Sequence, residues 1–432
     1  MGKKIISPGG NISGAASLPG DKSISHRYAI LAALAEGRTE IANYASAADC
    51  QSTLGCLRGL GITIEANHER VTIHGAGLAG MKPPRRPLDA ENSGTTMRML
   101  SGVLAGQSFT STITGDSSLR RRPMRRVIEP LRQMGAEIKS EEGFRAPLEI
   151  RGGKLRALDY TPPIPSAQVK SAILLAGLFA DGVSSVTETV ATRDHTELAL
   201  SEFGAKIEGS KGVIRIHPGP KLVGRQLAVP GDLSAAVFLI AAVLVLPKSS
   251  LTLHNVGLNP TRARVLDFLI SIGAKIHPTS VQMRHGELAG DLTVSHAPLS
   301  GGLIAGAQVA EMIDELPMLA ALGPFTEQGV EIHDARELRV KESDRIAALA
   351  AGLRAMGANV EEFPDGLRVA GREAGKLRGA KVEPQGDHRI AMALSIAALG
   401  AEGDTTIRDA DCVGVSFPDF YDAIEKLRGT KS

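Results

Sequence analysis

One kind of segment occurs six times in this chain of 432 residues. In each copy a polar or charged cluster precedes a long apolar run, and successive clusters are 66 to 82 residues apart. Such a run predicts a helix that is apolar all round and therefore buried. The first turn of a helix presents unpaired N–H groups and partial positive charge, which favour an anion. The repeat therefore predicts buried helices whose N-termini converge on a polyanionic ligand. The clusters begin at Asp21, Asn92, Ser166, Asp232, Asp314 and Asp387.

The second half of each repeat predicts a strand, an amphipathic helix, a glycine turn and a further strand, except that the sixth copy (DAIEKLRGT, 422–430) lacks the last strand. The turn recurs in LRGLGITIE (57–65), LRQMGAEIK (131–139) and LRAMGANVE (353–361). Glycine suits the end of a helix because the chain reverses there through positive φ. Each copy is thus a small α/β module rather than a solenoid turn. With ~150 residues per domain as the prior, six modules favour two domains of three.

Composition excludes several classes of protein. A net charge of +2 and the absence of a polybasic tail disfavour nucleic acid as a partner, and with 3% aromatic residues stacking platforms are not expected. The apolar runs are shorter than the ~20 residues of a membrane span, and the N-terminus lacks a signal core. Three cysteines and no CxxC or HExxH motif fit a reduced cytoplasm without a zinc site.

Two segments resemble nucleotide-binding motifs, but neither has the required context. Gly75 to Gly80 spells GxGxxG, yet the prolines of MKPPRRP follow where a helix should begin. Gly20-Asp21-Lys22-Ser23 resembles the end of a P-loop, but Asp21 interrupts it and the upstream glycine is misplaced. We therefore expect neither a Rossmann nor an NTPase site.

Several polar clusters place cations where a helix dipole disfavours them. Lys22 and Arg27 stand at the start of an apolar run, and Asp387-His388-Arg389 repeats the pattern. For any single cluster, a capped helix or a solvated face remains an alternative. The same holds for NSGTTMR (92–98), RRRPMRR (120–126) and RVKESDR (339–345), although together they favour an anion site.

Six motifs in one order resemble the 5-enolpyruvylshikimate-3-phosphate synthase (EPSP synthase) family. They are LPGDKSISHR, NSGTTMR, RRPM, SAQVK, RVKESDR and GDHRIAM, and with SFPDF near the end they extend over essentially the whole chain. Within the family, GDKS, SAQVK, RDHTE and NPTR are similar to the bacterial subclass that tolerates the inhibitor glyphosate.

The resemblance implies an α/β protein with the two-domain enolpyruvyl transferase fold. Each domain would hold three βαβαββ modules around buried parallel helices, an inside-out α/β barrel. The upper domain would be 20–230 and the lower domain 1–19 plus 231–432. The active site would lie in the interdomain cleft, in a cytoplasmic enzyme that we expect to be a monomer.

The resemblance also implies the reaction. The enolpyruvyl group of phosphoenolpyruvate would pass to the 5-hydroxyl of shikimate 3-phosphate, with release of phosphate, through a tetrahedral intermediate. These two small molecules would be the partners, and no metal or cofactor is implied. The catalytic residues by motif match are Lys22, Asp314 and Glu342. Shikimate 3-phosphate would contact Lys22, Ser23, Arg27, Ser166, Ala167, Gln168, Arg193, Asp314 and Lys341. Phosphoenolpyruvate would contact Lys22, Asn92, Gly94, Arg122, Gln168, Arg345, His388 and Arg389.

Two positions depart from the family pattern. Val415 stands where many members carry a lysine, so one cation is missing or is replaced, with Lys170 as a candidate. Glu337 stands where some members have asparagine. The alternatives are the sister transferase that acts on UDP-N-acetylglucosamine and a binding module without catalysis. The absence of cysteine from RRRPMRR disfavours the first, and the presence of Asp314 and Glu342 disfavours the second.

Overall fold

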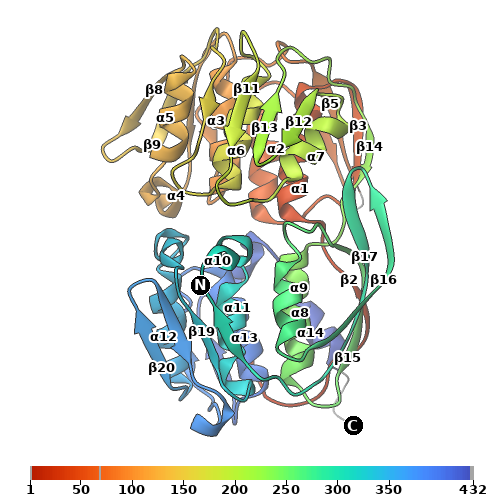
Figure 1. Ribbon diagram of the computed structural model, residues 1–432, viewed down its shortest axis with the longest axis vertical. Coiled ribbons are helices and arrows are strands. Elements are labelled where there is room, and N and C mark those ends of the chain that lie inside the picture. Colours follow the sequence, from red (N-terminus) through yellow and green to blue (C-terminus); the bar gives the residue numbers. More distant parts are fainter. Residues whose placement is uncertain (1, 68–69, 429–432) are drawn as a thin grey trace. The chain divides into compact units, whose positions relative to one another are not determined.

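The computed structural model describes residues 2–67 and 70–428 (Figure 1). The chain divides into two compact units. Unit 1 comprises Met1–Pro19, Gly231–Gln282 and Leu288–Ser432, and unit 2 comprises Gly20–Pro230 and Met283–Glu287. Residues 283–287, which the sequence places with the lower domain, thus group with unit 2. Residues 1 and 429–432 of the predicted lower domain lie outside the described part of the chain.

In its described residues, unit 2 has three four-stranded sheets with the orders β14-β3-β5-β4, β6-β7-β9-β8 and β10-β11-β13-β12. The first two strands of each order are parallel, and the other pairs are antiparallel. The strands are β3 (Glu36–Ala42), β4 (Thr63–Ala66), β5 (Arg70–Ala76), β6 (Leu88–Asp89), β7 (Thr110–Thr114), β8 (Glu137–Glu141), β9 (Arg145–Arg151), β10 (Asp159–Tyr160), β11 (Ser184–Thr187), β12 (Ile207–Ser210), β13 (Val213–Ile216) and β14 (Gln226–Ala228).

The helices of unit 2 belong to two kinds, as the repeat predicts. The apolar helices α1 (Lys22–Leu34), α3 (Gly94–Ala105) and α6 (Ala167–Gly177) are buried along nearly their whole length. The second kind buries one face and exposes the other; its members are α2 (Ala48–Gly59), α5 (Arg125–Gln133) and α7 (His195–Glu202), and the short α4 (Ser117–Arg121) precedes α5.

Unit 1 repeats this plan, with the sheet orders β16-β17-β15-β2, β18-β19-β21-β20 and β1-β23-β22. Each sheet again contains a parallel pair. The strands are β1 (Lys4–Ile6), β2 (Ser13–Ser17), β15 (Ser250–Gly257), β16 (Lys275–Arg284), β17 (Glu287–Ser295), β18 (Gly302–Ile304), β19 (Val330–Ile332), β20 (Val360–Phe363), β21 (Gly366–Val369), β22 (Lys381–Val382) and β23 (Thr405–Ile407). The helices are α8 (Leu233–Val245), α9 (Arg264–Ser271), α10 (Ala307–Met312), α11 (Leu316–Ala321), α12 (Arg345–Ala355), α13 (His388–Leu399) and α14 (Phe420–Leu427), and the 3₁₀ turns are η1 (Gly323–Phe325), η2 (Arg336–Val340), η3 (Arg372–Ala374) and η4 (Ala410–Val415).

Each unit has its own hydrophobic core, built around its apolar helices. All 13 residues of α8 are buried, and α13 is buried throughout. Burying a Leu, Ile or Val side chain contributes about 1.5–3 kcal/mol, so these helices are held by packing rather than by helix propensity. The predicted α/β modules with buried helices are therefore confirmed.

The N-cap position of each buried helix lies at the first residue of its predicted cluster or one residue after it. Asp21, Ser166, Asp232 and Asp387 are N-caps whose side chains accept a hydrogen bond from a first-turn N–H group. Ser93, rather than Asn92, caps α3, and α11 begins after Glu315, which makes no capping bond through its side chain. A cap satisfies one of the orphan donors of a helix start.

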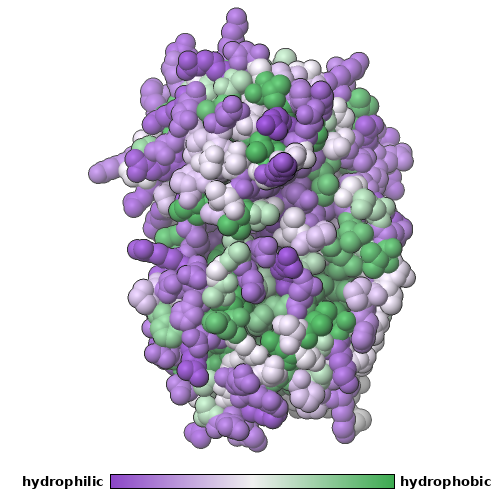
Figure 2. Space-filling model, in the orientation of Figure 1, coloured by the Kyte–Doolittle hydropathy of each residue, from purple (hydrophilic) through white to green (hydrophobic). Residues whose placement is uncertain are grey.

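The surface carries mostly polar residues, with local apolar exposure. Hydrophilic residues cover much of the face drawn in Figure 2. Val281 and Met283 on β16 are among the exposed large apolar side chains. Within residues 2–67 and 70–428, none of the helices combines the length and the hydrophobicity of a membrane span.

The approach of α3 to α6 yields a stability prediction. A β-carbon added at Gly102 would lie 2.2 Å from the carbonyl oxygen of Ala172, so one backbone must move. We expect Gly102→Ala to lower the free energy of unfolding by about 1–3 kcal/mol, the scale of overpacked cores. Gly55→Ala on the exposed side of α2 is the control, because no atom lies within 4 Å of the added carbon. Urea unfolding should show the control unchanged or more stable by about 0.5–1 kcal/mol; equal stability of the two variants would contradict this packing argument.

Candidate active site

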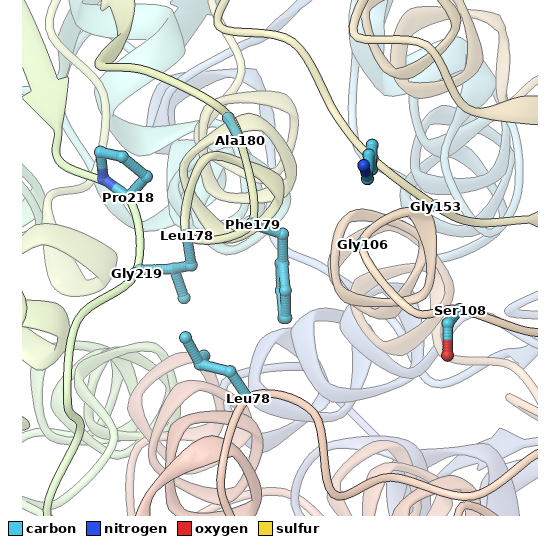
Figure 3. Close-up of a pocket in the computed structure, with 10 residues that line it drawn as sticks. Leu78, Gly106, Ser108, Gly153, Leu178, Phe179, Ala180, Pro218 and Gly219 are labelled. Atoms are coloured by element: carbon cyan, nitrogen blue, oxygen red, sulfur yellow. The ribbon is translucent and has the colours of Figure 1, made fainter.

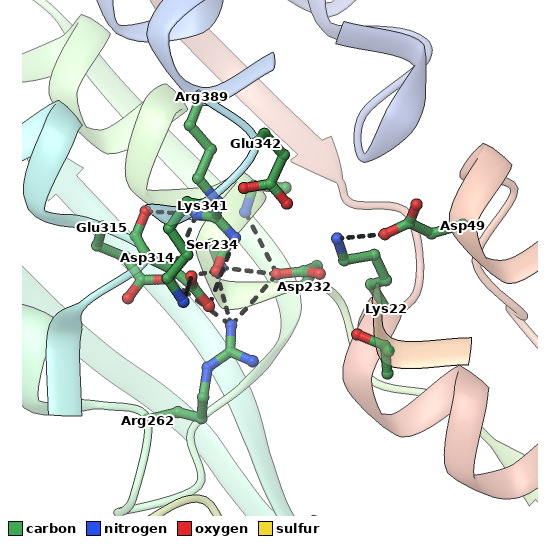
Figure 4. A network of polar contacts seen from close by, with 12 residues as sticks. Lys22, Asp49, Asp232, Ser234, Arg262, Asp314, Glu315, Lys341, Glu342 and Arg389 are labelled. Atoms are coloured by element: carbon green, nitrogen blue, oxygen red, sulfur yellow. Dashed lines mark hydrogen bonds and ion pairs between the residues drawn. The ribbon is translucent and has the colours of Figure 1, made fainter. Parts of the chain in front are cut away.

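In unit 2, the polar side chains gather at the starts of the buried helices. Lys22 is the first residue of α1, and its Nζ lies 2.9 Å from Oδ2 of Asp49 on α2 (Figure 4). Asp21 accepts the N–H group of Ile24 at 2.9 Å, which fixes the first turn. The side chain of Lys22 keeps 17% of its surface exposed, so its ammonium group can still meet a ligand.

Arg27 lies one turn further along α1 and joins α1 to α6 and α7. Its Nε donates to Thr196 Oγ1 at 2.6 Å, and its Nη2 donates to Ser171 Oγ at 2.9 Å. Its Nη1 donates to the carbonyl oxygen of Ser23 at 2.8 Å. Burial lowers the pKa of Arg27 to about 10, so the guanidinium stays charged at neutral pH. Neighbouring His26 is fully buried, and burial followed by the charges of Lys22 and Arg27 lowers its pKa well below the usual value.

A second group of side chains surrounds the start of α3. Arg122 Nη2 donates to Asn92 Oδ1 at 2.8 Å. Arg98 Nη1 donates to Gln168 Oε1 at 2.7 Å, which connects α3 to the first turn of α6. A β-carbon at Gly94 would lie 2.6 Å from Nη1 of Arg98 and 3.4 Å from Nη1 of Arg122. The absence of a β-carbon at Gly94 thus lets two arginine side chains approach the backbone at the start of α3.

Lys170 forms ion pairs with two glutamates, so it does not supply the accessible cation that many family members carry at the position of Val415. Its side chain is only 1% exposed, and its Nζ lies 2.6 Å from Glu197 and 3.0 Å from Glu188. Burial raises the pKa of Glu197, against the opposing effect of Lys170. Glu188 also accepts the N–H group of Thr192 at 3.1 Å, next to Arg193. Lys170 therefore holds the loop that presents Arg193.

In unit 1, Arg345 and Asp387 form the most deeply buried ion pair of the candidate site. Arg345 Nε lies 2.8 Å from Asp387 Oδ2, and the two side chains are 1% and 0% exposed. Burial alone would lower the pKa of Arg345, but Asp387, Glu342 and Asp314 raise it above the ordinary value. Burial alone would raise the pKa of Asp387, but Arg345 holds it below the ordinary value. This pair ties the start of α12 to the start of α13.

Two carboxylates of unit 1 lie among cations while keeping some exposure. Glu342 Oε2 is 2.6 Å from Arg345 Nη2, and Asp314 Oδ1 is 3.8 Å from both Lys341 Nζ and Arg345 Nη1. Arg389 Nη1 donates to the carbonyl oxygen of Asp314 at 2.6 Å. The Asp314 and Glu342 side chains are each 20% exposed. Part-exposed carboxylates in such a setting are able to exchange protons with a neighbouring molecule.

The predicted site residues divide between the two units. Unit 2 holds Lys22, Ser23, Arg27, Asn92, Gly94, Arg122, Ser166, Ala167, Gln168 and Arg193. Unit 1 holds Asp314, Lys341, Glu342, Arg345, His388 and Arg389. Val415 ends η4, which packs against α13.

Sequence reasoning missed several partners of these residues. Asp49 pairs with Lys22, and Arg98 bonds Gln168. Arg98 belongs to the NSGTTMR motif, so it could have been included. Asp49 lies in an ordinary amphipathic helix and gave no signal of its own.

A pocket at the other end of α3 and α6 is separate from these groups (Figure 3). Its lining is mostly apolar, with Leu78, Leu178, Phe179 and Pro218. Lys154 is the charged residue among the described residues that line this pocket, and Asp, Glu and His are absent from that lining. In the part of the chain that the structure describes, no three His, Cys, Asp or Glu side chains cluster as a metal site.

Comparison with known proteins gives one consistent result. The family model described as EPSP synthase (3-phosphoshikimate 1-carboxyvinyltransferase) matches residues 6–424. The 3-phosphoshikimate 1-carboxyvinyltransferase of Solibacter usitatus is 54% identical over 98% of the chain and 99% of the relative. The enzyme of the same name from Koribacter versatilis is 52% identical over 98% of each chain.

Solved structures agree with the predicted enolpyruvyl transferase fold. EPSP synthase from Acinetobacter baumannii superposes with a TM-score of 0.87 at 40% identity, covering 99% of this chain and 98% of that one. The enolpyruvyl transferase NikO from Streptomyces tendae reaches 0.77 at 20% identity over 98% of this chain and 96% of that one. The likeness to NikO concerns the fold alone.

The Arg345–Asp387 pair predicts a pH-dependent stability. Asp387→Asn leaves Arg345 buried beside a neutral amide, and we expect it to destabilise the protein by about 3–5 kcal/mol at pH 7. Because the pKa of Asp387 is lowered on folding, its contribution is present above the ordinary value of 3.8 and is lost as pH falls through the lowered one. Urea unfolding between pH 3 and 7 checks this. The difference in unfolding free energy between wild type and variant should stay constant above pH ~4, the ordinary pKa of an aspartate, and should shrink only toward the acid end.

Glu402→Gln is the control for this series, because Glu402 pairs with Lys376 on the exposed surface. It should change stability far less than Asp387→Asn. A wild-type advantage over Asp387→Asn that grew on acidification would contradict the assignment.

Proposed function

This chain belongs to the EPSP synthase family, and on that basis we propose which of its residues bind and convert the two substrates. The enzyme transfers the enolpyruvyl group of phosphoenolpyruvate to the 5-hydroxyl of shikimate 3-phosphate and releases phosphate, a step of aromatic amino-acid biosynthesis. The observation that carries this is the pair of part-exposed carboxylates, Asp314 and Glu342, held among cations.

Shikimate 3-phosphate is assigned to groups that can neutralise a phosphate and bond hydroxyls. Three N–H groups of Arg27 are held by protein oxygens, so its orientation is set before a ligand arrives. Preorganised charge of this kind binds an anion without further ordering cost. The proposed contacts are Lys22, Ser23, Arg27, Ser166, Ala167, Gln168, Arg193, Asp314 and Lys341.

Phosphoenolpyruvate is assigned to the arginines, because a guanidinium fork matches both carboxylate and phosphate. Arg122 is oriented by Asn92, and Arg345 is oriented by Asp387 and Glu342. Gly94 lets the Arg98 and Arg122 guanidinium groups approach the backbone at this subsite, since a β-carbon there would lie 2.6 Å and 3.4 Å from them. The proposed contacts are Lys22, Asn92, Gly94, Arg122, Gln168, Arg345, His388 and Arg389.

The proposed chemistry is addition followed by elimination. The methylene carbon of phosphoenolpyruvate takes a proton, the 5-hydroxyl oxygen attacks C2, and a tetrahedral ketal phosphate forms. A methyl proton then leaves and phosphate is expelled. We assign Asp314 to accept the hydroxyl proton, Glu342 to serve the methylene carbon, and Lys22 to contact both substrates and assist proton transfer.

Three finer assignments are also proposals. The motifs RDHTE, SAQVK and NPTR support membership of the glyphosate-tolerant subclass. The interactions of Lys170 with Glu188 and Glu197 link two of these motifs through side chains. We further propose that the enzyme acts as a monomer. We also propose a cytoplasmic location, because free thiols such as Cys50 and Cys56 fit a reducing compartment.

The function is tested by phosphate release with both substrates present. We expect Asp314→Asn and Glu342→Gln each to lower kcat by ~10²-fold or more, the usual scale for groups that transfer protons, while KM changes less. Arg122→Ala should instead mainly raise KM for phosphoenolpyruvate. Glu383→Gln, at an exposed pair with Arg408, is the matched carboxylate control and should keep wild-type kinetics. Absence of phosphate release by the wild type would reject the function, and near-normal kcat of Glu342→Gln would reject its role.

Glyphosate provides a second test at Gly94. The inhibitor is longer than phosphoenolpyruvate, and the added β-carbon approaches Arg98 and Arg122. We expect moderate native tolerance and a further rise of about 10-fold in the inhibition constant of Gly94→Ala, because one methyl group is worth ~1–3 kcal/mol. KM for phosphoenolpyruvate should rise by less. Both constants are measured for wild type and variant; unchanged inhibition would show that Gly94 does not line the inhibitor's end.

A further inference from the structure

Beside Asp314 and Arg389 lies a buried polar group that the assignments above leave without a role (Figure 4). It consists of Asp232, Ser234, Arg262 and Glu315, called here the support cluster. Arg262 is 4% exposed and Glu315 is 2% exposed. Buried charges are costly unless they are paired, so a cluster of this kind requires an explanation.

Arg262 is the cation at the centre of the support cluster. Its Nη2 donates to Ser234 Oγ at 2.7 Å and lies 3.6 Å from Asp232 Oδ1 and 3.9 Å from Glu315 Oε1. Ser234 in turn donates to Glu315 Oε1. Asp232 also accepts the Ser234 N–H group at 2.7 Å as the cap of α8. One guanidinium thus lies within 4 Å of two buried carboxylates, at the starts of α8 and α11.

The turn that carries Arg262 is fixed by its own hydrogen bonds. The Arg262 N–H group donates to the carbonyl oxygen of Asn259 at 2.8 Å. Asn259 Oδ1 accepts the N–H group of Thr261 at 2.9 Å, and Asn259 is buried. The guanidinium is therefore delivered to the support cluster from a defined position.

The support cluster meets the proposed catalytic groups through Glu315 and Arg389. Glu315 follows Asp314 directly in the chain and precedes the first residue of α11. Arg389 Nη1 lies 3.8 Å from Glu315 Oε1, and Arg389 Nη2 lies 3.9 Å from Asp314 Oδ2. Arg389 thus contacts both the buried carboxylate and the part-exposed one.

We propose that Arg262 is a positioning residue, which neutralises Glu315 so that Arg389 stays available to phosphoenolpyruvate. Without Arg262, Glu315 loses a neighbouring cation and attracts Arg389 more strongly from 3.8 Å, which draws the Arg389 guanidinium toward the support cluster. Arg262 acts through Arg389 and touches no substrate. The inference rests on the proposed role of Arg389 in binding phosphoenolpyruvate.

A purely structural role for Arg262 makes a different prediction. If Arg262 only joins α8 to α11, its removal lowers stability and disturbs both substrates alike. If it protects Arg389 from Glu315, its removal selectively weakens phosphoenolpyruvate binding. Removal of the Glu315 charge should then restore that binding, because the attraction of Arg389 into the support cluster is removed with it.

The experiment measures KM for each substrate and kcat in a double-mutant cycle. Arg262→Met should raise KM for phosphoenolpyruvate by about 10-fold, while KM for shikimate 3-phosphate changes by no more than about 2-fold. Arg262→Met/Glu315→Gln should return KM for phosphoenolpyruvate to within about 3-fold of wild type, a coupling typical of neighbouring groups. Arg262→Lys keeps the positive charge, so its KM for phosphoenolpyruvate should stay within about 3-fold of the wild-type value. Arg372→Met, at an exposed pair with Glu327 in unit 1, should leave all constants unchanged.

The outcomes separate this inference from the proposed function. Arg389→Ala should raise KM for phosphoenolpyruvate independently of the role of Arg262. An unchanged KM in Arg389→Ala would reject the proposed role of Arg389. If Arg389→Ala shows the rise but the double variant is not restored, the inference is overturned. Thermal unfolding checks each variant. If Arg262→Met does not fold, Glu315→Gln and the double variant decide the question. A near-normal KM for phosphoenolpyruvate in both supports the inference, and a raised KM in the double variant overturns it.

Discussion

The constraint on which this protein depends is the burial of helix starts. An apolar helix such as α8 or α13 is enclosed along its whole length, so water cannot satisfy its first N–H groups. Capping side chains from Asp21, Asp232 and Asp387 take some of these donors. The remaining partial positive charge attracts anions. The same groups that close the core therefore create a surface suited to phosphate and carboxylate.

Buried helix starts also explain why the cations come with carboxylate partners. Lys22 pairs with Asp49, Arg345 pairs with Asp387, and Arg262 compensates Glu315. An unpaired cation near a helix N-terminus is repelled by the dipole, and an unpaired buried charge is costly. A carboxylate partner fixes the orientation of each cation before the substrate binds. At the proposed substrate contacts Lys22 and Arg345, a substrate would then replace solvent rather than order the side chains.

The fold and the motif residues were predictable because both follow from local patterns. Hydrophobic runs with a capping residue specify a buried helix, and the observed starts agree within one residue even where Ser93 replaces Asn92. The partners of the motif residues were not predictable. Asp49 and Glu188 lie in unremarkable sequence, and only the fold brings them to Lys22 and Lys170. For the same reason Lys170 could be mistaken for an open cation, although two carboxylates enclose it.

The proposed catalytic carboxylates lie where the repeat is interrupted. Glu315 makes no capping bond through its side chain, and α11 spans only Leu316–Ala321, so the turn before it can present Asp314 beside Arg389. Glu342 precedes the cap Asp344 of α12, a helix of the second kind, which the anion pattern does not mark. A regular repeat of capped helices binds anions but supplies no base. Proton transfer therefore requires local departures from the repeat. In a sequence with a regular pattern, functional residues are expected at the positions where that pattern is broken.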